Sequence, residues 1–124
     1  MSSDTYREER HMHEIGVLLE VVKSVESFAL ENQVQKIETL VLQIGELSSM
    51  IPKYMMKLYP AAVDGTILEG SKLKIEVLSA NGLCKDCQNV FKVSENHGIC
   101  TACGSKNFEL LNGKEFFIKE VLCY

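Results

Sequence analysis

The sequence predicts an α+β fold: a small sheet with two helices, into which a short cysteine-rich ribbon is inserted. Three observations support this prediction. Apolar residues recur at helical spacing in two segments and at the two-residue spacing of strands in others. Two Cys-x-x-Cys pairs, Cys84/Cys87 and Cys100/Cys103, are separated by twelve residues. The segment that holds them has too few apolar residues to fold alone, so another interaction must stabilise it.

The composition limits the classes of protein to consider. The chain has 124 residues, 46% of them hydrophobic, and a net charge of −4. This acidity counts against nucleic-acid binding, which needs a basic face. No apolar run approaches the ~20 residues of a membrane span, and the polar first eleven residues do not form a signal peptide. Together with five cysteines that suit a reducing compartment, these features predict a cytoplasmic protein that binds neither nucleic acid nor membrane. The sequence does not decide whether the protein is a monomer or a homodimer.

The first helix is predicted to begin at His13. Residues 1–11 show no apolar periodicity and are predicted to be a disordered leader, or a cloning remnant, because His11-Met12 is what a cloning site at a start codon encodes. Residues 13–32 are predicted to form an amphipathic helix from apolar residues three and four apart. These residues are Ile15, Leu18, Leu19, Val22, Val25, Phe28 and Ala29.

The remaining elements follow from the same patterns. Residues 37–44 alternate as a strand closed by Gly45, a helix begins at Pro52, and residues 73–77 alternate as a second strand. Asn81-Gly82 is a turn dipeptide, and Asn112-Gly113 between apolar runs is a strong hairpin signal. We therefore expect residues 12–80 and 108–124 to form an α/β domain and residues 81–107 to form the inserted ribbon.

The four cysteines predict a metal site. Two cysteine pairs at this spacing supply the tetrahedral sulfur cage that zinc prefers, with iron as the main alternative and disulfides a weaker one. Four protein ligands leave no open coordination position, so the metal is expected to be structural. Gly98 and Gly104 allow the tight turns beside the cysteines. Cys123 is expected to be a small apolar residue ending a strand, with a reactive thiol or a further metal ligand as the alternative.

The histidines offer a second candidate site. His97 lies three residues before Cys100 and is either an exposed loop residue or a partner of the metal ligands that makes the site sensitive to pH. The run from His11 to Glu14 opens the first helix. A terminal amine, deprotonated backbone amides and an imidazole can enclose Ni(II) or Cu(II) in square-planar geometry, although histidines near a terminus are usually only solvated.

No catalytic constellation is apparent, so we expect a binding protein and not an enzyme. A rubredoxin-like iron redox protein is one alternative function, but its loops usually carry Pro and Gly, whereas these cysteine pairs enclose Lys-Asp and Thr-Ala. A zinc-ribbon interaction module that binds nucleic acid is another. It is disfavoured because the ribbon has only three lysines and no arginine.

Several motifs together resemble the HypA/HybF family of hydrogenase maturation nickel chaperones. They are Met-His-Glu at the start of the first helix, Ile-Gly-Glu-Leu-Ser at the end of a strand, Leu-Glu-Gly before another strand, and the double Cys-x-x-Cys followed by Phe108 and Asn112-Gly113. The resemblance covers residues 12–123, nearly the whole chain. It implies a small α/β nickel domain joined to a zinc ribbon, and therefore a metallochaperone.

The resemblance also implies site residues and partners. Nickel would be held by the Met12 amine and backbone, the His13 side chain and the backbone of Glu14, with His11 as a substitute. Structural zinc would be held by Cys84, Cys87, Cys100 and Cys103. The family delivers Ni(II) to the large subunit of [NiFe]-hydrogenase with the GTPase HypB, and in some bacteria serves urease maturation proteins. One departure is that eleven residues precede Met12 here, whereas the family's Met is the first residue.

Overall fold

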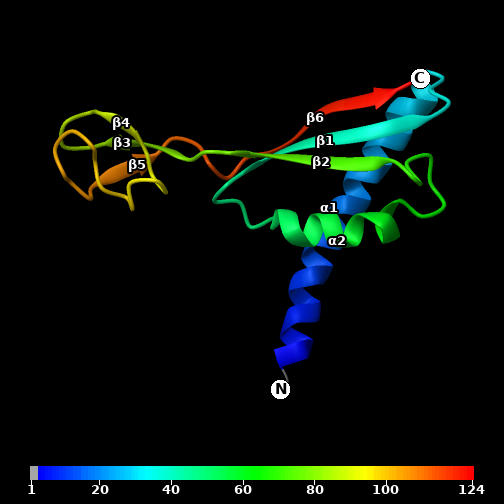
Figure 1. Ribbon diagram of the computed structural model, residues 1–124, viewed down its shortest axis with the longest axis horizontal. Helices are drawn as coiled ribbons and strands as arrows, with labels where there is room; N and C mark the ends of the chain where they lie inside the picture. The colour runs from blue at the N-terminus through cyan, green and yellow to red at the C-terminus, as the bar shows by residue number, and fades with distance from the viewer. Residues whose placement is uncertain (1–2) are drawn as a thin grey trace. The chain divides into compact units, whose positions relative to one another are not determined.

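The computed structural model describes residues 3–124, with side chains from residue 13 onward. This part of the chain forms two helices and six strands (Figure 1). The predicted α+β class, with two helices, a small sheet and a cysteine ribbon, is confirmed. In chain order the elements are α1 (Ser3–Glu31), β1 (Ile37–Gly45), α2 (Pro52–Val63), β2 (Lys72–Leu78), β3 (Asn81–Cys84), β4 (Val90–Lys92), β5 (Phe108–Leu110) and β6 (Phe116–Cys123).

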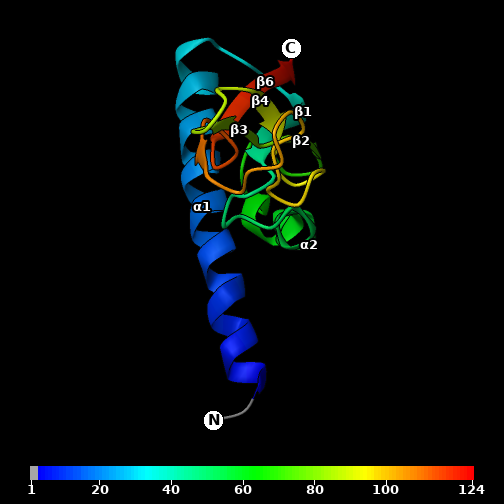
Figure 2. The same ribbon diagram turned by 90° about the vertical axis from the view of Figure 1, so that its left-hand side faces the viewer.

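Helix α1 carries the predicted apolar stripe but begins earlier than predicted. Leu18, Val21, Val22, Val25 and Ala29 are buried. The helix starts at Ser3 instead of His13 and is continuous (Figure 2), so residues 3–11, predicted to belong to a disordered leader, are helical. Glutamate and arginine are strong helix formers, and turns added to an existing helix avoid the cost of nucleation. Met1 and Ser2 lie outside the described residues.

Helix α2 begins at Pro52, as predicted. Proline suits the first helical position because its missing N–H would have no partner there. Met55, Tyr59, Ala62 and Val63 are buried, so these residues of the helix belong to the core, and α2 packs against α1. Pro60 lies inside the helix, which ends within about one turn after it, because proline removes a backbone donor.

The first sheet has the strand order β2-β1-β6. Strand β1 is central and buried almost along its whole length. The sequence predicted alternation between a core face and the opposite face, and the residues of the core face, Leu40, Leu42 and Ile44, are fully buried. Val41, expected on the opposite face, is buried as well. Strand β1 is therefore the most protected strand of the sheet.

The second sheet has the strand order β4-β3-β5, and β3 pairs antiparallel with both neighbours. Gly82 lies opposite Phe91 on one side and Leu110 on the other. The prediction that Asn81-Gly82 forms a turn was wrong, because both residues belong to β3. A Cβ on Gly82 would lie 2.9 Å from side-chain atoms of Phe108 and Val93, so glycine here permits close packing within a strand.

The predicted Asn112-Gly113 hairpin is also absent. The strands on either side, β5 and β6, belong to different sheets. Asn112 instead binds Asn81, the first residue of β3, and Ser79 just before that strand. Its Oδ1 accepts hydrogen bonds from the backbone N and the side-chain Nδ2 of Asn81, both at 3.0 Å, and its Nδ2 donates to the Ser79 carbonyl at 3.1 Å. The dipeptide therefore joins two chain segments that enter and leave the ribbon.

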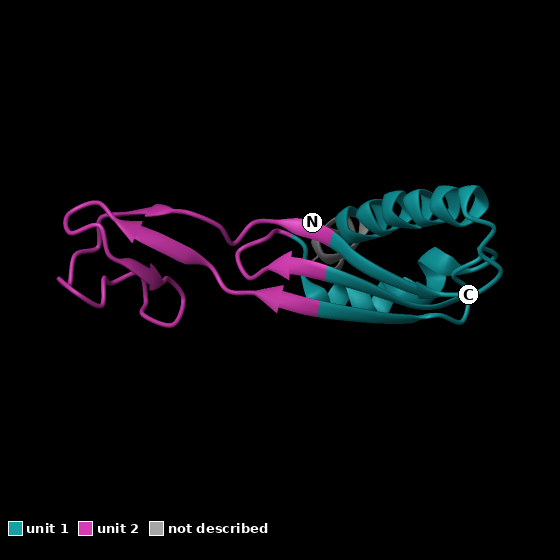
Figure 3. Ribbon diagram, turned by 90° about the horizontal axis from the view of Figure 1, so that it is seen from above, with its two compact units in different colours: residues 1–42, 50–75, 118–124 teal, residues 43–49, 76–117 magenta. Residues whose placement is uncertain are grey.

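The chain divides into two compact units (Figure 3). Unit 1 comprises Met1–Leu42, Met50–Ile75 and Ile118–Tyr124, and unit 2 comprises Gln43–Ser49 and Glu76–Phe117. Unit 2 contains the ribbon together with the ends of three strands that lead toward it. The two units do not coincide with the expected domains, because unit 2 is larger than the ribbon expected at residues 81–107. The expected ribbon boundaries therefore stay a prediction.

A hydrogen-bonded junction inside unit 2 explains the Gly45-Glu46 motif. The Gly45 amide donates to the Glu115 carbonyl, and the Leu47 amide donates to the Gly113 carbonyl, each at 2.8 Å. A Cβ on Gly45 would overlap the Gly113 carbonyl group. The Glu46 carboxylate accepts the amide of buried Ala80 at 2.6 Å. Glycine is required here by the close approach of two backbones. Glutamate provides a hydrogen-bond acceptor for the Ala80 amide, which is buried away from water.

Replacing Gly45 by alanine should destabilise the protein. The added methyl group has no space against the Gly113 backbone, and such overpacking typically costs about 1–3 kcal/mol. Gly16→Ala is the matched control, since no atom lies within 4 Å of a Cβ there. Within helix α1 that change should stabilise by about 0.5–1 kcal/mol. Urea unfolding followed by circular dichroism measures both, and a Gly45→Ala protein as stable as the unmodified chain would contradict the prediction.

Candidate metal centre

Two backbone turns with the same hydrogen bonds carry the four cysteines. We call residues 84–89 knuckle 1 and residues 100–105 knuckle 2. In each, the first cysteine's carbonyl accepts from the amide four residues later: Gln88 to Cys84 at 2.8 Å and Gly104 to Cys100 at 3.0 Å. Gln88 and Gly104 both have positive φ, at 66° and 76°. In each knuckle the first cysteine's amide also donates to the carbonyl five residues later, at 2.9 and 2.8 Å.

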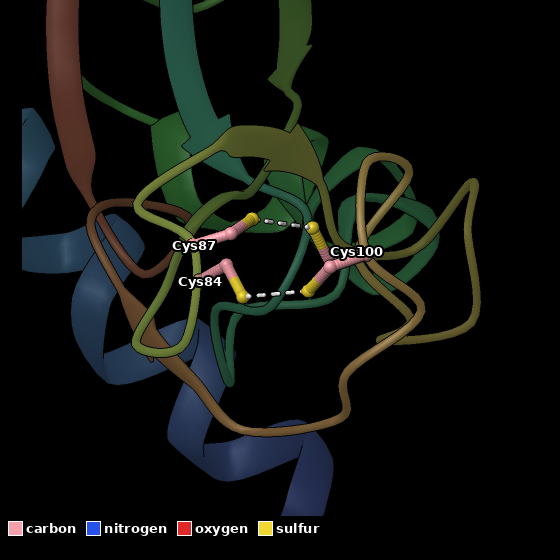
Figure 4. Close-up of side chains that lie close together, drawn as sticks. Cys84, Cys87 and Cys100 are labelled. Carbon is pink, nitrogen blue, oxygen red and sulfur yellow. Dashed lines mark hydrogen bonds between the residues drawn. The ribbon is translucent and has the colours of Figure 1, made fainter.

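These turns bring the four sulfur atoms together (Figure 4). All four Sγ atoms lie within 4.8 Å of one another. Cys84 Sγ lies 3.6 Å from Cys103 Sγ, and Cys87 Sγ lies 3.5 Å from Cys100 Sγ. A disulfide needs about 2.05 Å between sulfurs, and all four thiols are free. A sulfur tetrahedron around zinc, with Zn–S near 2.3 Å, has edges of about 3.8 Å, so these spacings fit a tetrahedral metal.

The two members of each cysteine pair differ in exposure. Cys84 and Cys100 are buried, whereas Cys87 and Cys103 are exposed. The buried pair forms the ribbon's small core with Phe91, and Val93 and Phe108 pack against it. The Phe91 and Phe108 rings meet edge to face with centroids 5.6 Å apart. Because cysteines make up most of this core, the stability of the ribbon depends on an interaction that keeps their sulfur atoms together, such as a bound metal ion.

The electrostatics of the sulfur group favour a cation. Burial disfavours the Cys100 thiolate, but the amides of Cys103 and Ala102 and the side chain of Asn89 donate to it and lower its pKa to about 6. The Asn89 amide favours the Cys87 thiolate, but reduced hydration and the neighbouring sulfurs outweigh it and raise its pKa to about 12. The first of the four thiols therefore ionises easily, whereas the last resists ionisation because negative charge accumulates among the clustered sulfurs. A divalent cation would allow all four to ionise.

His97 has a clear backbone role. It adopts positive φ, 54°, in the turn before Gly98, and its amide donates to the Ser94 carbonyl at 3.3 Å. Its side chain is exposed, and the metal-ligand group found among the described residues contains only the four cysteines. Its predicted part in the metal site stays a prediction.

The residues predicted to bind nickel lie on helix α1. His13 is exposed, whereas Glu14 is only 3% exposed. The side chains of His11 and Met12 lie outside the described residues. Because the helix starts at Ser3, the amides of His13 and Glu14 are inside the helix, where each amide donates to the carbonyl four residues earlier. These three predicted nickel positions, Met12 to Glu14, stay a prediction.

Sequence reasoning missed Asn89. Its Nδ2 donates to Thr101 Oγ1 at 3.0 Å and lies 3.6 Å from Cys100 Sγ. A signal was present in the spacing, since Asn89 follows Cys84 by five residues and Ser105 follows Cys100 by five. Cys123 ends strand β6, as predicted, and is a partly buried free thiol. In the described part of the chain, neither helix is long and apolar enough for a bilayer span.

Comparisons with known proteins agree on one family. The model of the family described as "Hydrogenase/urease nickel incorporation, metallochaperone, hypA" matches residues 12–123. The hydrogenase maturation factor HypA of Prosthecochloris aestuarii is 34% identical over 110 residues, covering 89% of this chain and 97% of that protein. HypA of Geobacter sulfurreducens is also 34% identical over 110 residues, with the same coverage of both chains.

Two solved structures are similar as well. The solution structure of the Ni metallochaperone HypA from Helicobacter pylori superposes with a TM-score of 0.60 and 28% identity, covering 89% of this chain and 96% of that chain. A second structure, described as the solution structure of HypA protein, gives a TM-score of 0.67 and 30% identity, covering 91% of this chain and 97% of that chain. With the family match over nearly the whole chain, these findings confirm that the chain belongs to the HypA family of nickel metallochaperones that act in hydrogenase maturation.

Proposed function

We propose that this chain binds Ni(II) and delivers it to the large subunit of [NiFe]-hydrogenase, working with the GTPase HypB in the cytoplasm. The observation that carries the proposal is the family match from residue 12 to residue 123, which begins at the Met-His-Glu run. His13 is exposed there and could exchange a metal with a partner. The family description also names urease, so urease maturation is a second destination for the same cargo.

Nickel would be held at the Met12 end of the chain. An exposed imidazole at His13, with a free amine at Met12 and deprotonated amides, would make a square-planar donor set that favours Ni(II). That arrangement needs amides that do not donate within a helix. We therefore propose that tight binding requires the chain to begin at Met12, and that with residues 3–11 helical only the side chains of His13, and of His11 as a substitute, remain as donors.

The four cysteines would hold structural zinc. Their sulfur spacing suits a tetrahedral ion, and four protein ligands leave no position for a substrate. The bound ion would neutralise the thiolates and keep the two knuckles together. The protein would then act by binding and transfer, without catalysis. A rubredoxin-like iron site is the alternative reading of the same sulfur group. Metal analysis and the colour of the purified protein distinguish the two.

Replacing His13 by alanine in a chain that begins at Met12 should abolish stoichiometric nickel binding, because the imidazole is lost as a donor. His97→Ala is the matched control, since His97 is also exposed but lies in the ribbon. Isothermal titration measures both variants. Undiminished nickel binding by His13→Ala would refute the assignment. The unshortened chain should bind nickel more weakly and without the square-planar absorption spectrum.

Removing zinc should unfold the ribbon while leaving the helices intact. Sulfur ligands supply two of the three fully buried residues of the ribbon core, Cys84 and Cys100, so loss of the ion leaves little to hold it. A strong chelator should collapse the amide NMR signals of residues 84–104, while the helical circular dichroism signal persists. A ribbon that keeps its dispersed signals without metal would contradict a structural role for zinc.

The metal-free chain should ionise its thiols in separated steps. The pKa of Cys100 is lowered to about 6 and that of Cys87 is raised to about 12, so one thiolate forms near neutral pH and the last only in strong alkali. Ultraviolet thiolate absorbance against pH should therefore rise first near pH 6 and remain incomplete up to high pH. A single step near the usual thiol pKa would be inconsistent with the sulfur cluster.

A further inference from the structure

The two knuckles hold each other through side chains at equivalent positions. Asn89 and Ser105 each follow the first cysteine of their knuckle by five residues, and their carbonyls accept that cysteine's amide. The side chain of each then crosses to the other knuckle. Asn89 donates to Thr101, and the Ser105 hydroxyl donates to the Asp86 carboxylate. The pair therefore forms two reciprocal links.

Only one of these links reaches a sulfur atom. Asn89 Nδ2 lies 3.0 Å from Thr101 Oγ1 and 3.6 Å from Cys100 Sγ. An amide NH₂ group has two hydrogens, so it can serve both acceptors at once. Asn89 is fixed at its backbone by knuckle 1 and at its side chain by knuckle 2, and it is only partly exposed. The Ser105 side chain makes no such contact with a cysteine sulfur: its hydroxyl donates to Asp86 and accepts the Asn107 amide at 3.0 Å, and only the Ser105 backbone amide reaches a sulfur, that of Cys103.

We propose that Asn89 is a positioning residue that controls how fast the four-cysteine site releases its metal. This inference rests on the zinc site proposed above. A hydrogen bond to a thiolate takes up part of its negative charge and fixes its direction, so the Cys100 sulfur is harder to protonate or pull off the ion. Removing a hydrogen bond to a metal ligand typically costs about ten- to a hundredfold in metal affinity. Thr101 anchors the amide so that its second hydrogen faces Cys100.

The chain supplies its own controls. Asn89→Ala removes the donor, and Asn89→Asp keeps the side chain's shape while replacing the donor by a carboxylate oxygen. Ser105→Ala breaks the equivalent link on the other side without touching a sulfur. Asn96→Ala removes another side-chain amide of the ribbon, one that donates to the Lys92 carbonyl at 2.8 Å. None of these residues is a proposed metal ligand.

The test measures zinc transfer from the full chain to a chromogenic chelator, after metal analysis has established one zinc per unmodified chain. Both Asn89 variants should release zinc at least about ten times faster, whereas Ser105→Ala and Asn96→Ala should stay within a fewfold of the unmodified rate. Cobalt-loaded protein gives a second readout. Loss of the donor to sulfur should move the sulfur-to-cobalt charge-transfer band to lower energy in the Asn89 variants alone.

Three results would overturn the proposal. Zinc release at the unmodified rate in both Asn89 variants would show that the sulfur contact is inconsequential. Equal acceleration in Ser105→Ala, with no band shift in the Asn89 variants, would show that any loosening of the knuckles suffices. A purified chain without zinc would refute the proposed zinc site itself, a failure visible before any variant is tested.

Discussion

The packing of four sulfur atoms into one small volume is the constraint on which the ribbon depends. Hydrophobic burial contributes little there, since two of the three buried residues of its small core are the cysteines Cys84 and Cys100. Reduced hydration and the neighbouring sulfurs together raise the pKa of Cys87 to about 12. Backbone amides that donate to the sulfurs of Cys84 and Cys100 favour their thiolate forms, and both knuckles are held by the same pattern of amide-to-carbonyl hydrogen bonds. A divalent cation would neutralise the thiolate charge that these amides leave uncompensated.

At the junction around Gly45 the constraint is a different one, the lack of space for a side chain. Three chain segments meet there, and their backbones approach closely enough that Gly45 has no room for a side chain. Glu46 and Asn112 then pair the polar groups that the meeting buries or partly buries, the Ala80 and Asn81 amides. The Gly-Glu pair of the Ile-Gly-Glu-Leu-Ser motif therefore meets a packing requirement. Its residue types follow from backbone geometry and from hydrogen-bond pairing.

Local patterns predicted what local forces decide, and failed where tertiary contacts decide. The apolar stripes of α1 and α2, the core face of β1 and the cysteine quartet follow from periodicity and spacing. Asn81-Gly82 and Asn112-Gly113 misled because glycine serves close approach as well as turning, and here Gly82 lies against Phe108 and Val93. The Asn89 link could not be read from composition, since it depends on two knuckles facing each other. Only its five-residue offset from Cys84 gave a signal.

Near the start of α1, the helix that the structure shows and the proposed nickel site need the same amide nitrogens, so they exclude each other. An α-helix from Ser3 commits the amides of His13 and Glu14 to carbonyls one turn earlier. Square-planar nickel coordination requires such amides to lose their protons and turn their nitrogens to the metal. The two are mutually exclusive at each amide, because an amide nitrogen cannot donate a hydrogen bond and ligate a metal at once. Any residues before Met12 that extend the helix would therefore compete with the proposed nickel site for these amides, since only the first four amides of a helix have no carbonyl partner within it.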